Sequence, residues 1–239
     1  MAVYLGNKKV SVKGGYIKDG GGDTSYPLSK FIAAEGKFAN TTYTYTELTN
    51  IIKPSDTSKQ QDFTYMFSGC TNLTTIPLID TSNATSMLSM FSDCTNLTTI
   101  PQLNTTKVYD MSHMFSGCTN LTTIPLMDTS KVTNMTNMFS GCTNLKVVPA
   151  LVCPIINNRG TVLTNMFQGC YNVEEIHMTG MTRTFNIQDC TKLTREALVE
   201  ILNNLGTPQR KTSLYLGSEN LAKLTEEDKA IATSKNWRL

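Results

Sequence analysis

Seven cysteines and two histidines are the side chains in this sequence best suited to redox, metal or nucleophilic chemistry. A zinc site needs converging Cys or His ligands, commonly spaced as Cys-x-x-Cys, and the sequence has no such pair. His113 takes a position that Ser89 and Asn137 hold in neighbouring copies of a repeated segment, and His177 follows a short apolar segment. We interpret both histidines as incidental surface residues and predict no metal site and no cofactor.

The cysteines instead form a regular series. Six of the seven occupy one position of the repeated segment, namely Cys70, Cys94, Cys118, Cys142, Cys170 and Cys190. Stacked copies would bring neighbouring members to about 4.8 Å, a separation that a disulfide tolerates. However, parallel side chains are poorly aimed at one another, and the first residues do not read as a secretory signal, which predicts a reducing compartment. We therefore predict a column of buried thiols that pack as small hydrophobic groups.

The acidic residues predict no catalytic arrangement. Glu174 and Glu175 read as a solvated edge, and the acidic run that starts at Glu226 as the first turn of a helix, where negative charge suits the helix dipole. A catalytic nucleophile needs a base that a third group orients, and two isolated histidines supply none. We therefore predict no catalytic residue and a protein that is not an enzyme.

Composition narrows the classes of partner. Of the 239 residues only 17% are charged, and the net charge is +2, so the chain lacks the basic stripe that neutralises phosphates. No apolar run approaches the roughly 18 residues of a membrane-spanning helix. We therefore expect neither nucleic acid binding nor membrane insertion. A neutral, hydroxyl-rich surface is suited to polysaccharide or protein instead.

One repeated segment organises most of the chain and must position these residues. Met66–Pro77 recurs as Met90–Pro101 and Met114–Pro125 at a period of 24 residues, and looser copies begin at Met138 and Met166. One copy cannot bury its apolar side chains alone, so we expect the copies to stack around a shared core.

Each copy predicts two elements. Ala84–Cys94 has apolar residues at helical spacing, which predicts a short helix that Asp-Thr-Ser caps and that Gly, or Asp93, ends in the left-handed conformation. Leu97–Pro101 has β propensity but ends in proline, which predicts a strand of about three residues. The predicted fold is an α/β repeat, a solenoid with a narrow parallel β-sheet on one side and short helices on the other.

Equivalent positions of stacked copies form columns. The predicted structural core contains Phe67, Cys70, Phe91, Cys94, Phe115, Cys118, Phe139, Cys142, Phe167 and Cys170. Two columns beside the strands are the candidate binding residues: Thr74, Thr75, Thr98, Thr99, Thr122, Thr123, Lys146, Val147, Glu174 and Glu175. The direction of the column that begins at Thr74 stays open, because Leu73 and Ile76 are three residues apart. Threonine also favours strands, so a purely structural role fits these residues equally well.

The two ends of the array differ from the repeats. Residues 1–13 predict a short β segment, and the glycines of residues 14–23, together with Pro27, predict a flexible connector. At the other end we predict a helix from Thr194 that Gly206 ends, then a strand at 213–216, a helix at 226–235, and Trp237 as a plug for the core. The predicted divisions are an attachment segment with linker, an N-terminal cap with a degenerate repeat, the repeats, and a C-terminal strand-helix cap: residues 1–30, 31–62, 63–193 and 194–239.

The unit Met-Phe-x-Gly-Cys-x-Asn-Leu-x-x-Ile-Pro followed by Asp-Thr-Ser, over about residues 48–193, resembles the BspA-like leucine-rich repeats of bacterial surface proteins and phage tail or fibre proteins. The ending from Leu214 to Trp237 is similar to the terminal unit of such proteins encoded by gut-bacterial phages. The resemblance implies a leucine-rich-repeat fold and a role in adhesion or host recognition rather than catalysis.

The resemblance leaves three functions open. The first is a module of a phage tail or fibre that recognises a bacterial cell-surface glycan or protein and contacts other virion proteins through its N-terminal segment. A virion location fits a chain without a secretory signal, because virion proteins assemble inside the host and leave by lysis. The alternatives are a BspA-like adhesin on the bacterial cell surface and a virion decoration protein without a receptor. The sequence is compatible with a homo-oligomer, although no heptad run demands one.

Overall fold

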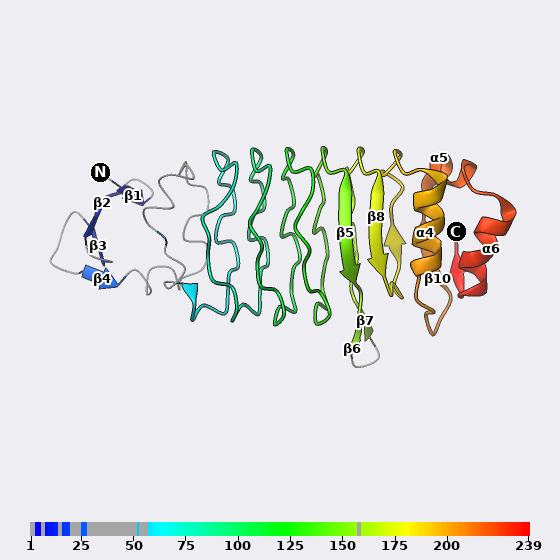
Figure 1. The fold of residues 1–239 in the computed structure, drawn as a ribbon, viewed down its shortest axis with the longest axis horizontal. Coiled ribbons are helices and arrows are strands. Elements are labelled where there is room, and N and C mark those ends of the chain that lie inside the picture. The colour runs from blue at the N-terminus through cyan, green and yellow to red at the C-terminus, as the bar shows by residue number, and fades with distance from the viewer. Residues whose placement is uncertain are drawn as a thin grey trace.

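Residues 57–156 and 159–193 wind into coils that stack side by side (Figure 1). The computed structural model describes residues 3–5, 8–13, 16–19, 25–27, 52, 57–156 and 159–239. Parallel bridges join equivalent positions of successive coils at Asp62–Ser86, Ser86–Asp110, Asp110–Asn134 and Asn134–Val162. The first three bridges each span 24 residues, so the period of the sequence is the period of the stack.

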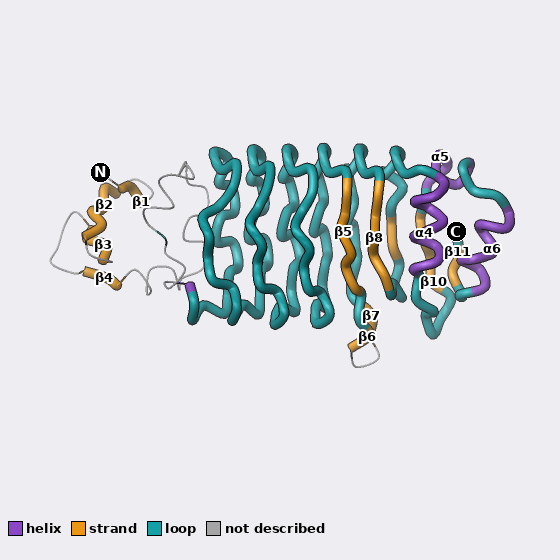
Figure 2. Tube along the Cα trace, viewed as in Figure 1, coloured by secondary structure: helices purple, strands orange, loops and turns teal. Residues whose placement is uncertain are grey.

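The segments predicted as short helices are chains of turns (Figure 2). Within residues 84–94, the Met90 N–H donates to the Met87 carbonyl at 3.2 Å, whereas the Phe91 N–H donates to the Met114 carbonyl of the next coil at 2.9 Å. In an α-helix each N–H donates a hydrogen bond to the carbonyl four residues earlier in the same helix. The helix prediction is therefore wrong, because alternate N–H groups leave the segment and tie each coil to the next.

Left-handed residues explain why these turns cannot become a helix. The predicted stop positions have positive φ, between 69° and 76° at the four repeat glycines and 59° at Asp93. A second left-handed column, which the sequence did not reveal, lies four residues earlier at Tyr65, Ser89, His113, Asn137 and Asn165, with φ between 52° and 56°. The left-handed conformation costs an L-residue free energy, so it occurs at single positions. A right-handed helix does not continue through such a residue.

The Asp-Thr-Ser segments, predicted as helix caps, also link coils. Thr81 Oγ1 accepts a hydrogen bond from the Asn104 N–H at 2.8 Å and donates to the Asn104 carbonyl at 3.0 Å. Thr105 Oγ1 donates in the same way to the Asp128 carbonyl at 2.9 Å. Both threonines are buried, so their hydroxyls satisfy backbone groups that would otherwise be buried without partners.

The parallel sheet of the coils has fewer regular strands than predicted. Within the described coils, β5 (Val147–Val152) and β8 (Glu175–Thr179) form the one pair of regular parallel strands. Even here the register shifts between Val148 and Leu151, on either side of Pro149. Proline has no N–H to donate, and each preceding copy ends its extended segment in proline.

The core is one continuous cluster along the array. All ten predicted core residues, from Phe67 to Cys170, are at most 1% exposed. Ile52, ahead of the described coils, is 2% exposed and belongs to the same cluster. The side chains predicted from helical spacing thus face inward, although the backbone that carries them is not helical.

A hairpin interrupts the regular stack. The coil that begins at Met138 is four residues longer than its predecessors, because the next copy begins at Met166. The antiparallel strands β6 (Ile155–Ile156) and β7 (Arg159–Gly160) project from this coil beyond the end of β5 (Figure 1).

Four strands near the N-terminus form an antiparallel sheet in the order β1 to β4: Val3–Leu5, Lys8–Lys13, Tyr16–Asp19 and Ser25–Pro27. The first two lie in the predicted β segment. The other two lie within the predicted flexible connector, so that prediction is wrong there, because β3 has the β propensity of Tyr and Ile. The glycines at 14–15 and 20–22, and most of the predicted cap over 31–62, lie outside the described residues.

Three helices and a small sheet follow the coils. The helices are α4 (Arg195–Asn204), α5 (Gly217–Ala222) and α6 (Glu226–Ser234). Parallel pairings order the strands β9 (Phe185–Asn186), β10 (Thr212–Tyr215) and β11 (Trp237–Arg238) as β11-β10-β9. The predicted elements at 194–205, 213–216 and 226–235 match α4, β10 and α6 closely, and α5 was not predicted.

Side-chain contacts explain this ending. Thr194 and Thr225 cap α4 and α6, and Asp228 completes a capping box on α6. Trp237 is fully buried, and its Nε1–H donates to the Gly206 carbonyl at 2.8 Å. Asn236 supplies the left-handed turn before β11, with φ of 70°.

Candidate functional site

Both candidate columns reach the surface on one side of the coils, which we call the strand face. It consists of Thr74, Thr75, Thr98, Thr99, Thr122, Thr123, Lys146, Val147, Glu174 and Glu175. Of these, Thr75 and Val147 are half-buried and the others exposed. Leu73 and Ile76 are at most 2% exposed, so the two residues between them turn outward together. The column that begins at Thr74 therefore points outward.

Hydrogen bonds between coils hold the strand face in register. The Thr98 N–H and Oγ1 both donate to the Thr74 carbonyl at 3.0 Å, and the Lys146 N–H donates to the Thr122 carbonyl at 2.9 Å. The Thr98 hydroxyl thus has a structural role. The hydroxyls of Thr99 and Thr122 make no hydrogen bond within the described structure, which leaves them for a partner or solvent.

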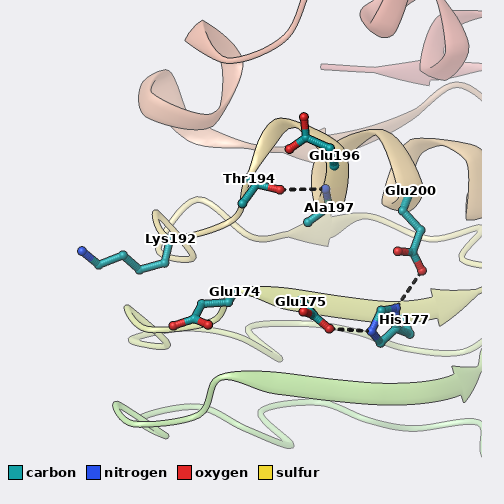
Figure 3. Close-up of a pocket in the computed structure, with 8 residues that line it drawn as sticks. All are labelled: Glu174, Glu175, His177, Lys192, Thr194, Glu196, Ala197 and Glu200. Carbon is teal, nitrogen blue, oxygen red and sulfur yellow. Dashed lines mark hydrogen bonds and ion pairs between the residues drawn. The ribbon is translucent and has the colours of Figure 1, made fainter.

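An open hollow of about 620 Å³ lies where the strand face meets α4. Its lining comprises Glu174, Glu175, His177, Lys192, Thr194, Glu196, Ala197 and Glu200 (Figure 3). Two of these residues, Glu174 and Glu175, belong to the predicted binding columns. Lys146 Nζ lies 4.0 Å from Glu174 Oε1, and both side chains are more than half exposed, so solvent screens this ion pair.

His177 lies between two carboxylates from different elements (Figure 3). Its Nδ1 is 2.7 Å from Glu200 Oε1 on α4, and its Nε2 is 3.0 Å from Glu175 Oε2 on β8. The hydrogen bond to Glu200, helped by the bond to Glu175, raises the pKa of His177 above its ordinary value of 6.5. The interpretation of His177 as incidental is wrong, because its charged form joins β8 to the first helix after the coils.

The period of the repeat could have revealed this contact. Glu200 follows His177 by 23 residues, close to one period, and Glu175 precedes it by two, on the same side of the strand. Lys192 and Glu196, also missed, line the same hollow from the following coil and α4.

The arrangement suits recognition of a polar partner. Both nitrogens of His177 already contact carboxylates, and the one hydroxyl of the lining, Thr194 Oγ1, accepts the Ala197 N–H at 3.2 Å as a helix cap. No group of three His, Cys, Asp or Glu in the described parts of the chain is placed to hold a metal ion.

The cysteines and the other histidine have structural contacts. None of the seven cysteines forms a disulfide and all are buried, and the thiols of four repeat cysteines donate to a carbonyl of the preceding coil at 3.0 Å. Burial raises the pKa of Cys153 and Cys170 to about 12. His113 Nε2 lies 3.2 Å from Asn137 Nδ2 of the next coil.

Comparisons with known proteins agree with this geometry. Residues 113–199 match the model of the BspA-type leucine-rich-repeat region, a family with six copies of the repeat. Residues 35–150 match the family described as Mycoplasma protein of unknown function, DUF285. No curated protein matches the chain.

A solved structure supports the same fold. The crystal structure of a T. pallidum leucine-rich-repeat protein aligns with a TM-score of 0.50 and 18% identity, over 75% of this chain and 78% of that one. No helix within the described segments is long and apolar enough to cross a membrane. The repeated unit, the stacked coils and these matches together confirm the predicted family: the chain is a BspA-like leucine-rich-repeat protein.

Proposed function

We propose that the chain is a non-enzymatic binding module that recognises its partner through the strand face. Leucine-rich-repeat families and folds are typically binding modules, and they generally bind proteins. The observation that carries the proposal is the outward pairing of residues such as Thr98 and Thr99 in coil after coil, on a backbone that hydrogen bonds hold at a fixed spacing.

The chemistry of the strand face indicates the kind of partner. From Thr74 to Thr123 the face carries no formal charge, and free hydroxyls such as that of Thr99 can both donate and accept hydrogen bonds. From Lys146 onward charged side chains replace them, down to the hollow beside α4. A glycan or protein of a bacterial cell surface fits the neutral part, and the charged end supplies specificity.

The test is binding of the intact chain to bacterial cells and to a glycan array. Thr99→Arg combined with Thr123→Arg places two bulky cations on the neutral part of the face. We expect binding to fall by about tenfold or more, equivalent to about 1.4 kcal/mol. The matched control is Thr106→Arg with Ser130→Arg, two exposed residues with the same separation along the chain but outside the strand face. Equal loss in both variants would contradict recognition by the strand face.

We further propose that the chain is displayed on a phage tail or fibre, with residues 1–30 as the attachment segment. The family also fits a bacterial surface adhesin, and a decoration protein without a receptor is the third reading. Mass spectrometry of purified virions and of washed bacterial surfaces distinguishes the first two. Absence from the particle, with presence on the cell surface, would favour the adhesin.

A further inference from the structure

The β6–β7 hairpin brings a second, oppositely charged site to the far end of strands β5 and β8. It projects beyond the end of β5, whereas the Glu-lined hollow lies at the start of β8 (Figure 1). Insertions in repeat proteins map to loops on one face, which is often a binding face. The hairpin is thus the place where an insertion in the array adds side chains beyond those of the repeat.

Two adjoining hollows flank the hairpin, and arginines supply their charge. Arg159 and Arg183 line both hollows, and Arg210 lines the second. No Asp or Glu is among the described residues of either lining. The charge of this region is therefore of one sign.

The three guanidinium groups are unpaired as far as the described residues extend. Arg159, Arg183 and Arg210 are all exposed, and none lies within ion-pair distance of a described carboxylate. Arg195, by contrast, forms a bidentate pair with Asp228, with both N–O distances 2.8 Å. Three unpaired guanidiniums side by side are a ready set of donors for carboxylates.

The hairpin packs closely on the next coil at Gly160. A Cβ at this position would lie 2.2 Å from Thr182 Oγ1 and 3.4 Å from Arg183 Cγ. A Cβ here would require the Thr182 side chain to move, so glycine favours the close approach of the hairpin to the next coil. Gly160, which follows Arg159, therefore lies close to Thr182 and Arg183 of the next coil, and both arginines line the two adjoining hollows.

Apolar surface lies beside the arginines. Ile155 is 59% exposed at the base of the hairpin, and it lines the second hollow together with Pro208. Arginine beside an exposed aliphatic side chain is typical of protein interfaces, where the guanidinium binds carboxylates and the apolar group covers a partner side chain. An inorganic anion offers no aliphatic group to Ile155, whereas a peptide segment can offer a whole aliphatic side chain.

From this juxtaposition we propose that the hairpin site, formed by Ile155, Arg159, Arg183 and Arg210, binds an acidic peptide segment of a partner protein. The carboxylates bind the guanidinium groups, and an aliphatic side chain of the segment packs on Ile155. This site is separate from the strand face, so the chain has two contact surfaces of different chemistry.

The probe is a labelled peptide that alternates Glu and Leu, titrated with the full chain by fluorescence anisotropy. We expect saturable binding that weakens with salt, and a loss of about tenfold in Arg159→Glu and in Arg183→Glu, equivalent to about 1.4 kcal/mol each. Ile155→Ser should weaken binding of this peptide but not of a Glu and Ser version. The matched control is Lys192→Glu, the same charge change at the Glu-lined hollow.

Three results would overturn the proposal. The first is an equal loss of peptide binding in Lys192→Glu and Arg183→Glu, which would mean general charge attraction. The second is tighter binding of hyaluronate fragments than of the peptide. The third is binding of inorganic phosphate alone that depends on Arg183. Each variant is first shown to melt at the wild-type temperature. Binding of bacterial cells by Arg183→Glu is measured in parallel, and its retention separates this site from the strand face.

Discussion

Five phenylalanines stack ring on ring through the coils, and each ring fills the space between two coils. The centroids of Phe67, Phe91, Phe115, Phe139 and Phe167 follow one another at 5.6 to 5.8 Å, with interplanar angles of 2° to 18°. Phe185 ends the series edge-on, at 76° to Phe167. Each ring excludes water for both of its neighbours, so the column couples adjacent coils.

We expect Phe91→Ala to lower the free energy of unfolding by about 3 to 5 kcal/mol, because the cavity removes ring contacts on two sides. Phe91 is fully buried between Phe67 and Phe115. Urea denaturation measures the change, and Thr99→Ala, at an exposed position, is the control. An unchanged denaturation curve for Phe91→Ala would be incompatible with a stacked core.

The buried thiol column predicts that the cysteines of the folded protein react slowly with thiol reagents. Burial raises the pKa of Cys118 and Cys142 well above the ordinary value of 9.0. Since the thiolate is the reactive form, we expect almost no reaction with a thiol reagent under native conditions and seven thiols after unfolding. Colorimetric thiol titration at neutral pH measures the number of reactive thiols before and after unfolding. Three disulfides, or rapid reaction of the folded protein, would contradict the buried column.

At the scale of elements, the sequence predicted which side chains are buried better than the shape of the backbone. The apolar spacing of Ala84–Cys94 fits a helix and a chain of turns equally, because both put the same side chains on one side. The helix and the chain of turns differ in φ at Ser89 and Asp93, and serine in a sequence does not predict a left-handed conformation. In the C-terminal segment, Thr194 and Thr225 caps mark real helices, because local capping chemistry decides those boundaries.

The candidate site was predictable in part for the same reason. Periodicity placed Thr99 and Glu175 on the surface without knowledge of the strand directions. It could have identified Glu200, which follows His177 by 23 residues, but not Arg183, because Arg183 lies beside an inserted hairpin. Contacts across an insertion depend on how far it projects, which no spacing rule supplies.

The ion pairs of His177 predict a pH-dependent link between β8 and α4. Because the pKa of His177 is raised, the stabilisation is fully present below pH 6.5, the ordinary value, and is lost as the pH rises through the raised pKa. NMR titration of the His177 ring should give a midpoint above 6.5, and Glu200→Gln should lower it. The effect of Glu200→Gln on unfolding should be larger at about pH 6 than at about pH 8.

Glu196→Gln is the matched control for this link. Glu196 lies on the same helix and lines the same hollow, but it does not contact His177. It should leave the His177 midpoint close to that of the wild type. A midpoint below 6.5 in the wild-type protein would contradict the assignment.

At the scale of the whole molecule, the coils share one core, so their two ends decide whether it stays dry. In a stacked array each interior coil is covered by its neighbours, whereas a terminal coil exposes one side unless an atypical unit covers it. The segment after Gly206 supplies Leu214, Leu216 and Trp237 to the core, all at most 2% exposed. The sheet β11-β10-β9 continues the coils by parallel pairing, and α6 packs on α4.

Deletion of residues 207–239 should therefore cause aggregation rather than yield a smaller soluble protein. The deletion removes the partner strand of Phe185 and the cover of Ile187, both fully buried in the intact chain, and leaves an unpaired strand edge beside them. Size-exclusion chromatography with light scattering measures the outcome, and the full chain with Trp237→Phe is the control for mild loss of packing. A monodisperse truncated protein with a cooperative melting transition would show that the coils close without this segment, and the C-terminal residues would then need another role.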